Sequence, residues 1–115
     1  MKADTLNRKL LKALPELTEE YEAETCWQEG DKTGSHVVFG DVLVPYLRDA
    51  ICNNEIEIVQ KVFAFLKEEW ILNDEYSQDV IAVSVLESMA DLWEKYEEIF
   101  DRLDEDMKNI IRSFV

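Results

Sequence analysis

Apolar residues recur along most of the chain at steps of three and four, which is the spacing of one face of an α-helix. Leu6, Leu10 and Leu14 show this spacing near the start, and Val59 and Phe63 show it in the middle. The pattern predicts helices over residues 3–14, 15–28, a stretch ending at 52, 54–73, 76–90, 91–103 and a last one that continues from a cap at Asp104 to the end of the chain.

Polar and proline residues indicate where two of these helices begin. Asn54, with Glu57 three residues later, has the form of a capping box at the start of the helix over 54–73. Pro45 leaves two starts open for the helix before it, because proline is tolerated only near a first turn. That helix begins either near Asp41 or, after a short turn, near Val44.

The run Val80–Leu86 is apolar and β-branched on all sides, and alone it could be a buried strand. No partner strand is predicted elsewhere, and the sequence continues to Ala90 without a turn signal, so we expect a central helix surrounded by its neighbours. The one loop of any length covers residues 29–36. The sequence therefore predicts an all-α fold, with six to seven antiparallel helices in a compact bundle or a short HEAT-like stack.

Length and composition agree with a single helical domain over residues 1–115. Hydrophobic residues make up 47% of the chain, and there are only three glycines and two prolines. Cys26 and Cys52 stand in no C-x-x-C pattern, so we expect reduced, partly buried thiols. Charges in the first residues argue against a signal peptide, and no apolar run is long enough to cross a bilayer. These features predict a cytoplasmic protein.

Acidic residues dominate the chain and are concentrated in two stretches. There are 26 acidic and 12 basic residues, which gives a formal net charge of −14. Residues 16–31 hold seven acids and no base, and residues 87–106 hold nine acids against two bases. Such a surface repels nucleic acids and anionic membranes and attracts basic proteins. We therefore expect a basic protein partner, with no direct binding of nucleic acid or membrane.

The second acidic stretch predicts a defined stripe, because four of its acids are spaced i, i+3, i+4 and i+7 from Glu94 to Asp101. The stripe is either a solvated face or a docking surface for a cationic protein. Trp27 ends the first stretch and is a candidate interface anchor, whereas Trp70 and Trp93 fit core positions. The candidate partner-binding residues are Glu16, Glu19, Glu20, Glu24, Trp27, Glu94, Glu97, Glu98, Asp101 and Asp104.

Residues typical of catalysis are scarce. His36 is the only histidine, and it stands in no metal-ligand spacing. It is open to three interpretations: a structural or surface residue, a partner contact, or a general base. No phosphate-binding glycine motif, EF-hand loop or di-iron motif is present. We therefore predict that the protein is not an enzyme and that it has no catalytic residue, no metal and no cofactor.

Three segments carry a resemblance to a known class of protein. They are residues 36–47 (HVVFGDVLVPYL), 63–69 (FAFLKEE) and 80–87 (VIAVSVLE). Together they resemble the small helical immunity proteins of bacterial contact-dependent growth inhibition, over most of residues 17–103. The resemblance implies a cytoplasmic antitoxin that binds the toxin domain of a delivered effector. Such toxins are often nucleases acting on tRNA or DNA, and their clefts are basic because they hold phosphate backbones.

Two other classes of function stay open from the sequence. The first is an acidic adaptor or regulatory module whose partner is not a toxin, which would share the fold and the charge. The second is an enzyme that uses carboxylates, with or without a metal ion. The position of the gene relative to a large effector gene separates the adaptor from the immunity protein, and a stoichiometric metal in the purified protein would favour the enzyme.

Overall fold

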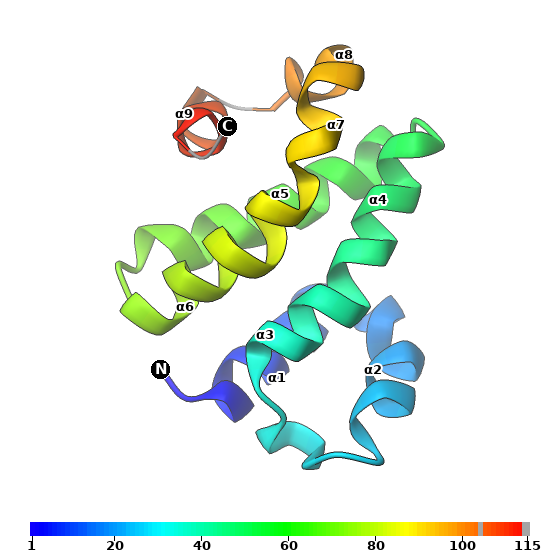
Figure 1. Cartoon of the computed structure of the whole chain (residues 1–115), viewed down its shortest axis with the longest axis vertical. Helices are drawn as coiled ribbons and strands as arrows, with labels where there is room; N and C mark the ends of the chain where they lie inside the picture. Colours follow the sequence, from blue (N-terminus) through cyan, green and yellow to red (C-terminus); the bar gives the residue numbers. More distant parts are fainter. Residues whose placement is uncertain (104, 114–115) are drawn as a thin grey trace.

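The computed structural model describes residues 1–103 and 105–113, with the backbone alone at position 93. Every regular element in this part of the chain is helical, which confirms the all-α prediction and excludes a strand at residues 80–86 (Figure 1). In chain order the helices are α1 (Ala3–Ala13), α2 (Thr18–Thr25), α3 (Ser35–Val38), α4 (Val44–Cys52), α5 (Ile56–Ile71), α6 (Glu75–Asp79), α7 (Ala90–Lys95), α8 (Glu97–Phe100) and α9 (Glu105–Arg112).

Shorter helical turns join several of these elements. When uninterrupted stretches are counted as one, the described residues form eight helical runs. Seven of these runs contain an α-helix, in agreement with the predicted six to seven. The run predicted over residues 15–28 ends earlier, at Thr25. The joining turns are 3₁₀ at Pro15–Leu17, Gly30–Lys32 and Glu87–Met89, and π-helical at Phe39–Leu43 and Val80–Leu86.

A single helical run joins α3 to α4 through the π-helical turn Phe39–Leu43. In this turn the N–H of Val44 donates to the carbonyl five residues back, rather than four. The wider turn accommodates Pro45, which has no N–H for the carbonyl of Asp41 and would crowd that carbonyl in a regular α-helix. The α-helix α4 begins at Val44, as the second predicted start has it, and the start near Asp41 is wrong; the prediction missed that the helical run leading into α4 already begins at Ser35.

Asn54 ends α4 instead of starting α5. Its φ of 58° is left-handed, and its N–H donates to the carbonyl of Ile51 at 3.2 Å, while the N–H of Glu55 donates to the carbonyl of Ala50 at 2.8 Å. This pair of bonds is a Schellman motif, which satisfies the last carbonyls of a helix. The predicted capping box with Glu57 is wrong, since the residue before α5 is Glu55 and no side chain caps that helix.

The run from α6 to α7 also contains a π-helical segment, and its burial pattern follows from that geometry. Residues 80 and 81 are buried, residues 82–84 turn toward the surface, and residues 85 and 86 are buried again. This repeat of five residues matches the hydrogen bonding from residue i to residue i+5 in a π-helix. The prediction that this segment is buried on all sides is wrong at Val83, which is 47% exposed. The buried residues are Val80, Ile81, Val85 and Leu86.

The break that was predicted between residues 90 and 91 lies six residues later. The helix continues to Lys95, and Tyr96, with φ −124° and ψ 44°, separates α7 from α8. Aspartate is a residue type that often caps the start of a helix. The carboxylate of Asp91 instead binds the guanidinium of Arg48 on α4 through two contacts of 3.0 Å. Asp91 is the second residue of α7, inside the continuous run, and its side chain links α7 to α4.

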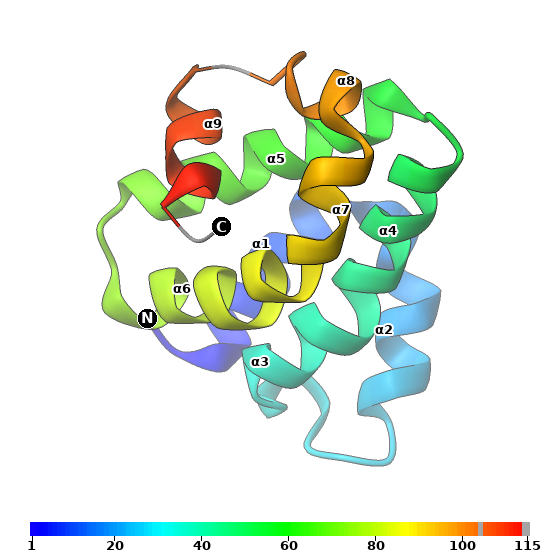
Figure 2. The ribbon, with the colours of Figure 1, turned by 45° about the horizontal axis from the view of Figure 1, so that its top comes forward.

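One buried cluster runs from Leu6 in α1 to Ile111 in α9, so all the long helices share a core (Figure 2). The radius of gyration is 13.4 Å, close to the roughly 13 Å expected for a compact domain of this length. This favours the compact bundle over an extended stack. Within the described residues, no helix combines the length and the apolar character needed to cross a bilayer.

A buried polar residue fastens the loop before α3 to the first helix. The side chain of Asn7 is fully buried, and its Nδ2 donates to the carbonyls of Asp31 and Thr33 at 3.1 and 2.7 Å. Its Oδ1 accepts a hydrogen bond from the hydroxyl of Ser35 at 2.8 Å. The N–H of Ser35 donates in turn to the hydroxyl of Tyr76 at 3.0 Å. The expected loop at residues 29–36 is therefore held in place along much of its length.

Candidate functional site

The two acidic stretches lie on different parts of the molecule. Figure 1 shows α8 at one end of the longest axis, which spans 38 Å, and α2 in the opposite half. The first stretch therefore forms one candidate surface around α2, and the second forms another around α7, α8 and α9. No single face joins them, so each candidate residue has to be judged in its own surroundings.

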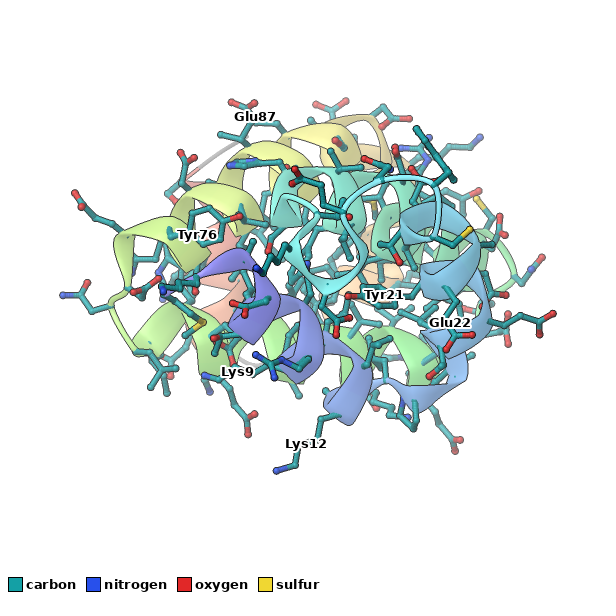
Figure 3. All side chains as sticks on the ribbon, turned by 90° about the horizontal axis from the view of Figure 1, so that it is seen from below. Lys9, Lys12, Tyr21, Glu22, Tyr76 and Glu87 are labelled. Atoms are coloured by element: carbon teal, nitrogen blue, oxygen red, sulfur yellow. The ribbon has the colours of Figure 1, made fainter. Side chains whose placement is uncertain are left out.

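Basic side chains gather on α1, away from much of the acidic surface. Lys9 and Lys12 project from α1 on the side opposite Glu87 (Figure 3). Lys9 Nζ lies 3.3 Å from the buried carboxylate of Glu69 on α5, so this base also supports the core. Other basic residues, such as Lys61 and Lys108, lie beside acidic side chains, so the bases are not confined to α1.

Glu16, the first candidate, is engaged within the protein. Lys61 Nζ lies 3.2 Å from Glu16 Oε1, and the hydroxyl of Tyr46 donates to Oε2 at 2.7 Å. Partial burial alone would raise the pKa of Glu16, but the hydrogen bonds from Tyr46 and Lys61 outweigh it and lower the pKa below its usual value. Partial burial and the same contact raise the pKa of Tyr46 to about 12. Glu16 thus links the first 3₁₀ turn to α4 and α5.

Glu24 is also engaged, whereas Glu19 and Glu20 face solvent. A hydrogen bond with Asp41, with a smaller contribution from burial, raises the pKa of Glu24 above its usual value. Gln28 Nε2 lies 3.4 Å from Glu24 Oε1. Glu19 and Glu20 are exposed, and neither side chain forms an ion pair within the described part of the chain.

Trp27 lies on the surface just after α2, with 71% of its area exposed. This position is compatible with the predicted anchor. Trp70 is partly buried and packs against the core, as predicted, and the prediction for Trp93 concerns a side chain outside the described residues. Ile71, the last residue of α5, and Leu72, which follows it, are exposed apolar residues that sequence reasoning missed.

The acidic stripe predicted in the second stretch is interrupted by the break at Tyr96. Glu94 lies on α7, Glu97 begins α8 and Asp101 directly follows α8, and all three are exposed on one groove. Glu98 lines a hollow of about 480 Å³ beside the end of α4. Glu94 and Glu97 therefore line both hollows, whereas Asp101 lines only the first and Glu98 only the second.

The α8–α9 groove has a volume of about 390 Å³ and is lined by residues at α7, α8 and α9. Two largely buried apolar side chains, Phe100 and Ile111, form its floor, and charged side chains form its walls. The groove is lined by Glu94, Glu97, Phe100 and Asp101 on one side and by Lys108, Ile111 and Arg112 of α9 on the other.

The two walls of the groove differ in how far their charges are already satisfied. Lys108 Nζ lies 3.2 Å from Glu105 Oε1, and Arg112 Nη1 lies 3.5 Å from Asn109 Oδ1. The three carboxylates on the facing wall form no ion pair within the described part of the chain. The unsatisfied charge of the groove is therefore negative.

Other acids of the second stretch are paired with neighbouring helices. The hydrogen bond from Arg48 lowers the pKa of Asp91 below its usual value. Asp106 Oδ2 lies 3.5 Å from Lys67 Nζ of α5 and holds α9 against that helix. Asp104, the remaining candidate and the predicted cap of the last helix, lies outside the described residues. Pairing thus distinguishes structural acids from acids that remain available.

His36 joins α3 to the run that contains α6. Its Nδ1 lies 2.8 Å from Ser84 Oγ and its Nε2 lies 3.1 Å from Asp79 Oδ2, while Tyr76 packs edge-on against the ring. The order of groups resembles a nucleophile, a base and an orienting acid. However, Ser84 stands inside a helical run, where backbone N–H groups are already bonded and cannot stabilise an oxyanion. We interpret the cluster as a structural link, made by partners that the sequence did not indicate.

Both cysteines are free and exposed, so the prediction of partly buried thiols is wrong. Cys26 directly follows α2 and Cys52 is the last residue of α4, and both helix ends leave the side chain at the surface. Among the described residues, no three histidine, cysteine, aspartate or glutamate side chains are grouped closely enough to hold a metal ion.

Comparison with protein families gives a match over almost the whole chain. A family model with the description "Domain of unknown function (DUF7674)" matches residues 7–115. No curated protein and no solved structure matches the chain. The arrangement of helices and charges described above therefore carries the functional argument.

Proposed function

The chain belongs to the DUF7674 family, and we propose that it is an immunity protein that binds and neutralises a basic toxin domain. The observation that carries the proposal is the set of exposed, unpaired carboxylates around the α8–α9 groove. The most suitable partner is a nuclease acting on tRNA or DNA, because its cleft must be basic to hold phosphates. A bound acidic protein competes with that substrate for the same positive charges.

Several features support binding over catalysis. The net charge of −14 favours fast association with a cationic protein, and the rate should fall as salt screens the charges. The resemblance of segments such as residues 36–47 and 80–87 to immunity proteins points to the same role. Action in the cytoplasm, as an inhibitor without cofactor or metal, is part of the proposal.

Co-expression with the toxin encoded beside the gene tests the proposal directly. Cells that produce the toxin domain alone should stop growing, and cells that also produce this protein should grow. A toxin of another allelic type should not be neutralised, which controls for general protection. Failure to restore growth with the neighbouring toxin would refute the proposal, and capture of a basic partner that is not toxic would favour the adaptor function instead.

A further inference from the structure

We propose that the α8–α9 groove is the seat of the partner and that its occupant is a cationic amphipathic helix. The proposal rests on the proposed function, and it names the surface and the segment that make the complex. Basic side chains of the incoming helix lie against Glu94, Glu97 and Asp101, and an apolar side chain covers the floor formed by Phe100 and Ile111.

Charge complementarity identifies the occupant as cationic. Lys108 and Arg112 on the α9 wall already contact neighbours of their own helix at 3.2 and 3.5 Å. The facing carboxylates have no such partner within the described residues, and Glu97 repels Asp101, which follows it by four residues at the end of α8. An incoming base relieves that repulsion and adds new ion pairs. The unpaired carboxylates of the free protein therefore favour the binding of a cation.

Spacing identifies the occupant as helical. Glu94, Glu97 and Asp101 follow one another at intervals of three and four residues, and all of them reach the same groove despite the break at Tyr96. Basic side chains at i, i+3 and i+7 on a facing helix repeat at a similar interval. The volume of about 390 Å³ holds a few side chains, as in complexes where an amphipathic helix inserts its apolar face into a groove.

The surface around α2 is the competing position, and two of its acids are already engaged within the protein. Glu16 is paired with Lys61, and Glu24 shares a hydrogen bond with Asp41. What remains on α2 is a set of exposed glutamates beside Trp27. This surface therefore provides the matched control, because it allows the same change of charge without touching the groove.

A defined peptide and two charge-reversed variants test the inference. The probe is a synthetic helical peptide of about 16 residues, with arginines at i, i+3 and i+7 and leucines on the adjoining stripe. Its binding to the ¹⁵N-labelled full chain is followed by NMR shifts and by calorimetry. The groove variant carries Glu94→Lys, Glu97→Lys and Asp101→Lys, and the control variant carries Glu19→Lys, Glu20→Lys and Glu22→Lys. Circular dichroism shows whether both variants keep their helices, and Glu97→Gln serves as a milder substitution.

The expected result is a set of shifts confined to residues 94–101 and 105–112, with affinity reduced roughly tenfold or more in the groove variant and much less in the control. The peptide with its residues in scrambled order should bind more weakly, because it has the charge without the stripe. Shifts centred on α2, equal losses in both variants, or no saturable binding would overturn the inference. The growth-rescue experiment is separate, so neutralisation of the toxin by the groove variant would refute the groove while leaving the proposed function intact.

Discussion

Replacing Asn7 with alanine should destabilise the fold more than the exposed surface changes considered below. The side chain makes three hydrogen bonds of 2.7 to 3.1 Å that connect α1 to the loop before α3. Each bond contributes about 1 kcal/mol, and the buried groups left behind on Thr33 and Ser35 lose partners that water cannot readily replace. Alanine recovers a few tenths of a kcal/mol through its helix propensity. The free energy of unfolding should therefore fall by about 2–4 kcal/mol, a large part of the 5–15 kcal/mol typical of a domain.

Urea denaturation followed by far-UV circular dichroism measures this loss. Asn7→Asp keeps the size of the side chain but removes both donors to the loop carbonyls, so it should destabilise the protein in the same direction. Asn109→Ala on the exposed face of α9 is the control, and its effect should stay within about 0.5 kcal/mol. A loss below about 1 kcal/mol for Asn7→Ala, with a normal denaturant dependence, would refute the idea that Asn7 holds the loop.

Three further predictions follow from single contacts. Asn54→Ala should lower the free energy of unfolding by about 1 kcal/mol in urea, because alanine resists the left-handed φ of 58°, whereas Asn54→Gly should cost much less; equal losses would contradict the role of this residue. Asp74→Ala should lower the melting temperature at pH 7, since the terminal amine of Met1, at 2.8 Å, and the first turn of α6 depress the pKa of Asp74 to about 2. A carboxyl group with a depressed pKa stabilises the fold above about pH 4 and loses this effect as the pH falls through 2, so the gap to the wild type should shrink in melts at pH 2, and a constant gap would contradict the assignment. Glu97→Gln should raise stability by about 0.2–0.5 kcal/mol at low salt and less at high salt, because it removes repulsion from Asp101 four residues later; a loss would mean that Glu97 has a stabilising partner.

The regular helices could be predicted from the sequence because their burial depends on local spacing. In α1 and α5 the residues at steps of three and four are the buried ones, as with Leu6, Leu10 and Phe63. These helices pack one face on a shared core, so periodicity alone identifies the inward side. The class of the fold follows from the same signal.

The interruptions of the helices could not be predicted because each depends on a neighbour. Asn54 is a residue type suited to the start of a helix, yet its backbone lies in the hydrogen-bonded motif that ends α4. Asp91 resembles a cap until Arg48 of another helix is brought beside it. Asn7 looks like an ordinary polar position in a helix, and only the return of the loop near residue 33 shows why it is buried. In each case the deciding contact joins segments that the sequence keeps apart.

The candidate site was predictable in composition but not in arrangement. The excess of acids in residues 87–106 is visible in the sequence, and so is the spacing of Glu94, Glu97 and Asp101. Which acids stay unpaired depends on where α4, α5 and α9 place their bases. The apolar floor beside α9 has no local signal in the sequence.

The π-helical segment Val80–Leu86 also bears on how this element could change in length. A π turn holds one residue more than an α turn, and here the surplus lies on the outer side, at and around Val83. A shortened form of the chain that lacks one residue at this point could close into an ordinary helix while keeping both flanks in register with the core. Position 83 is therefore the place where the deletion of one residue would be absorbed without turning the residues on either side.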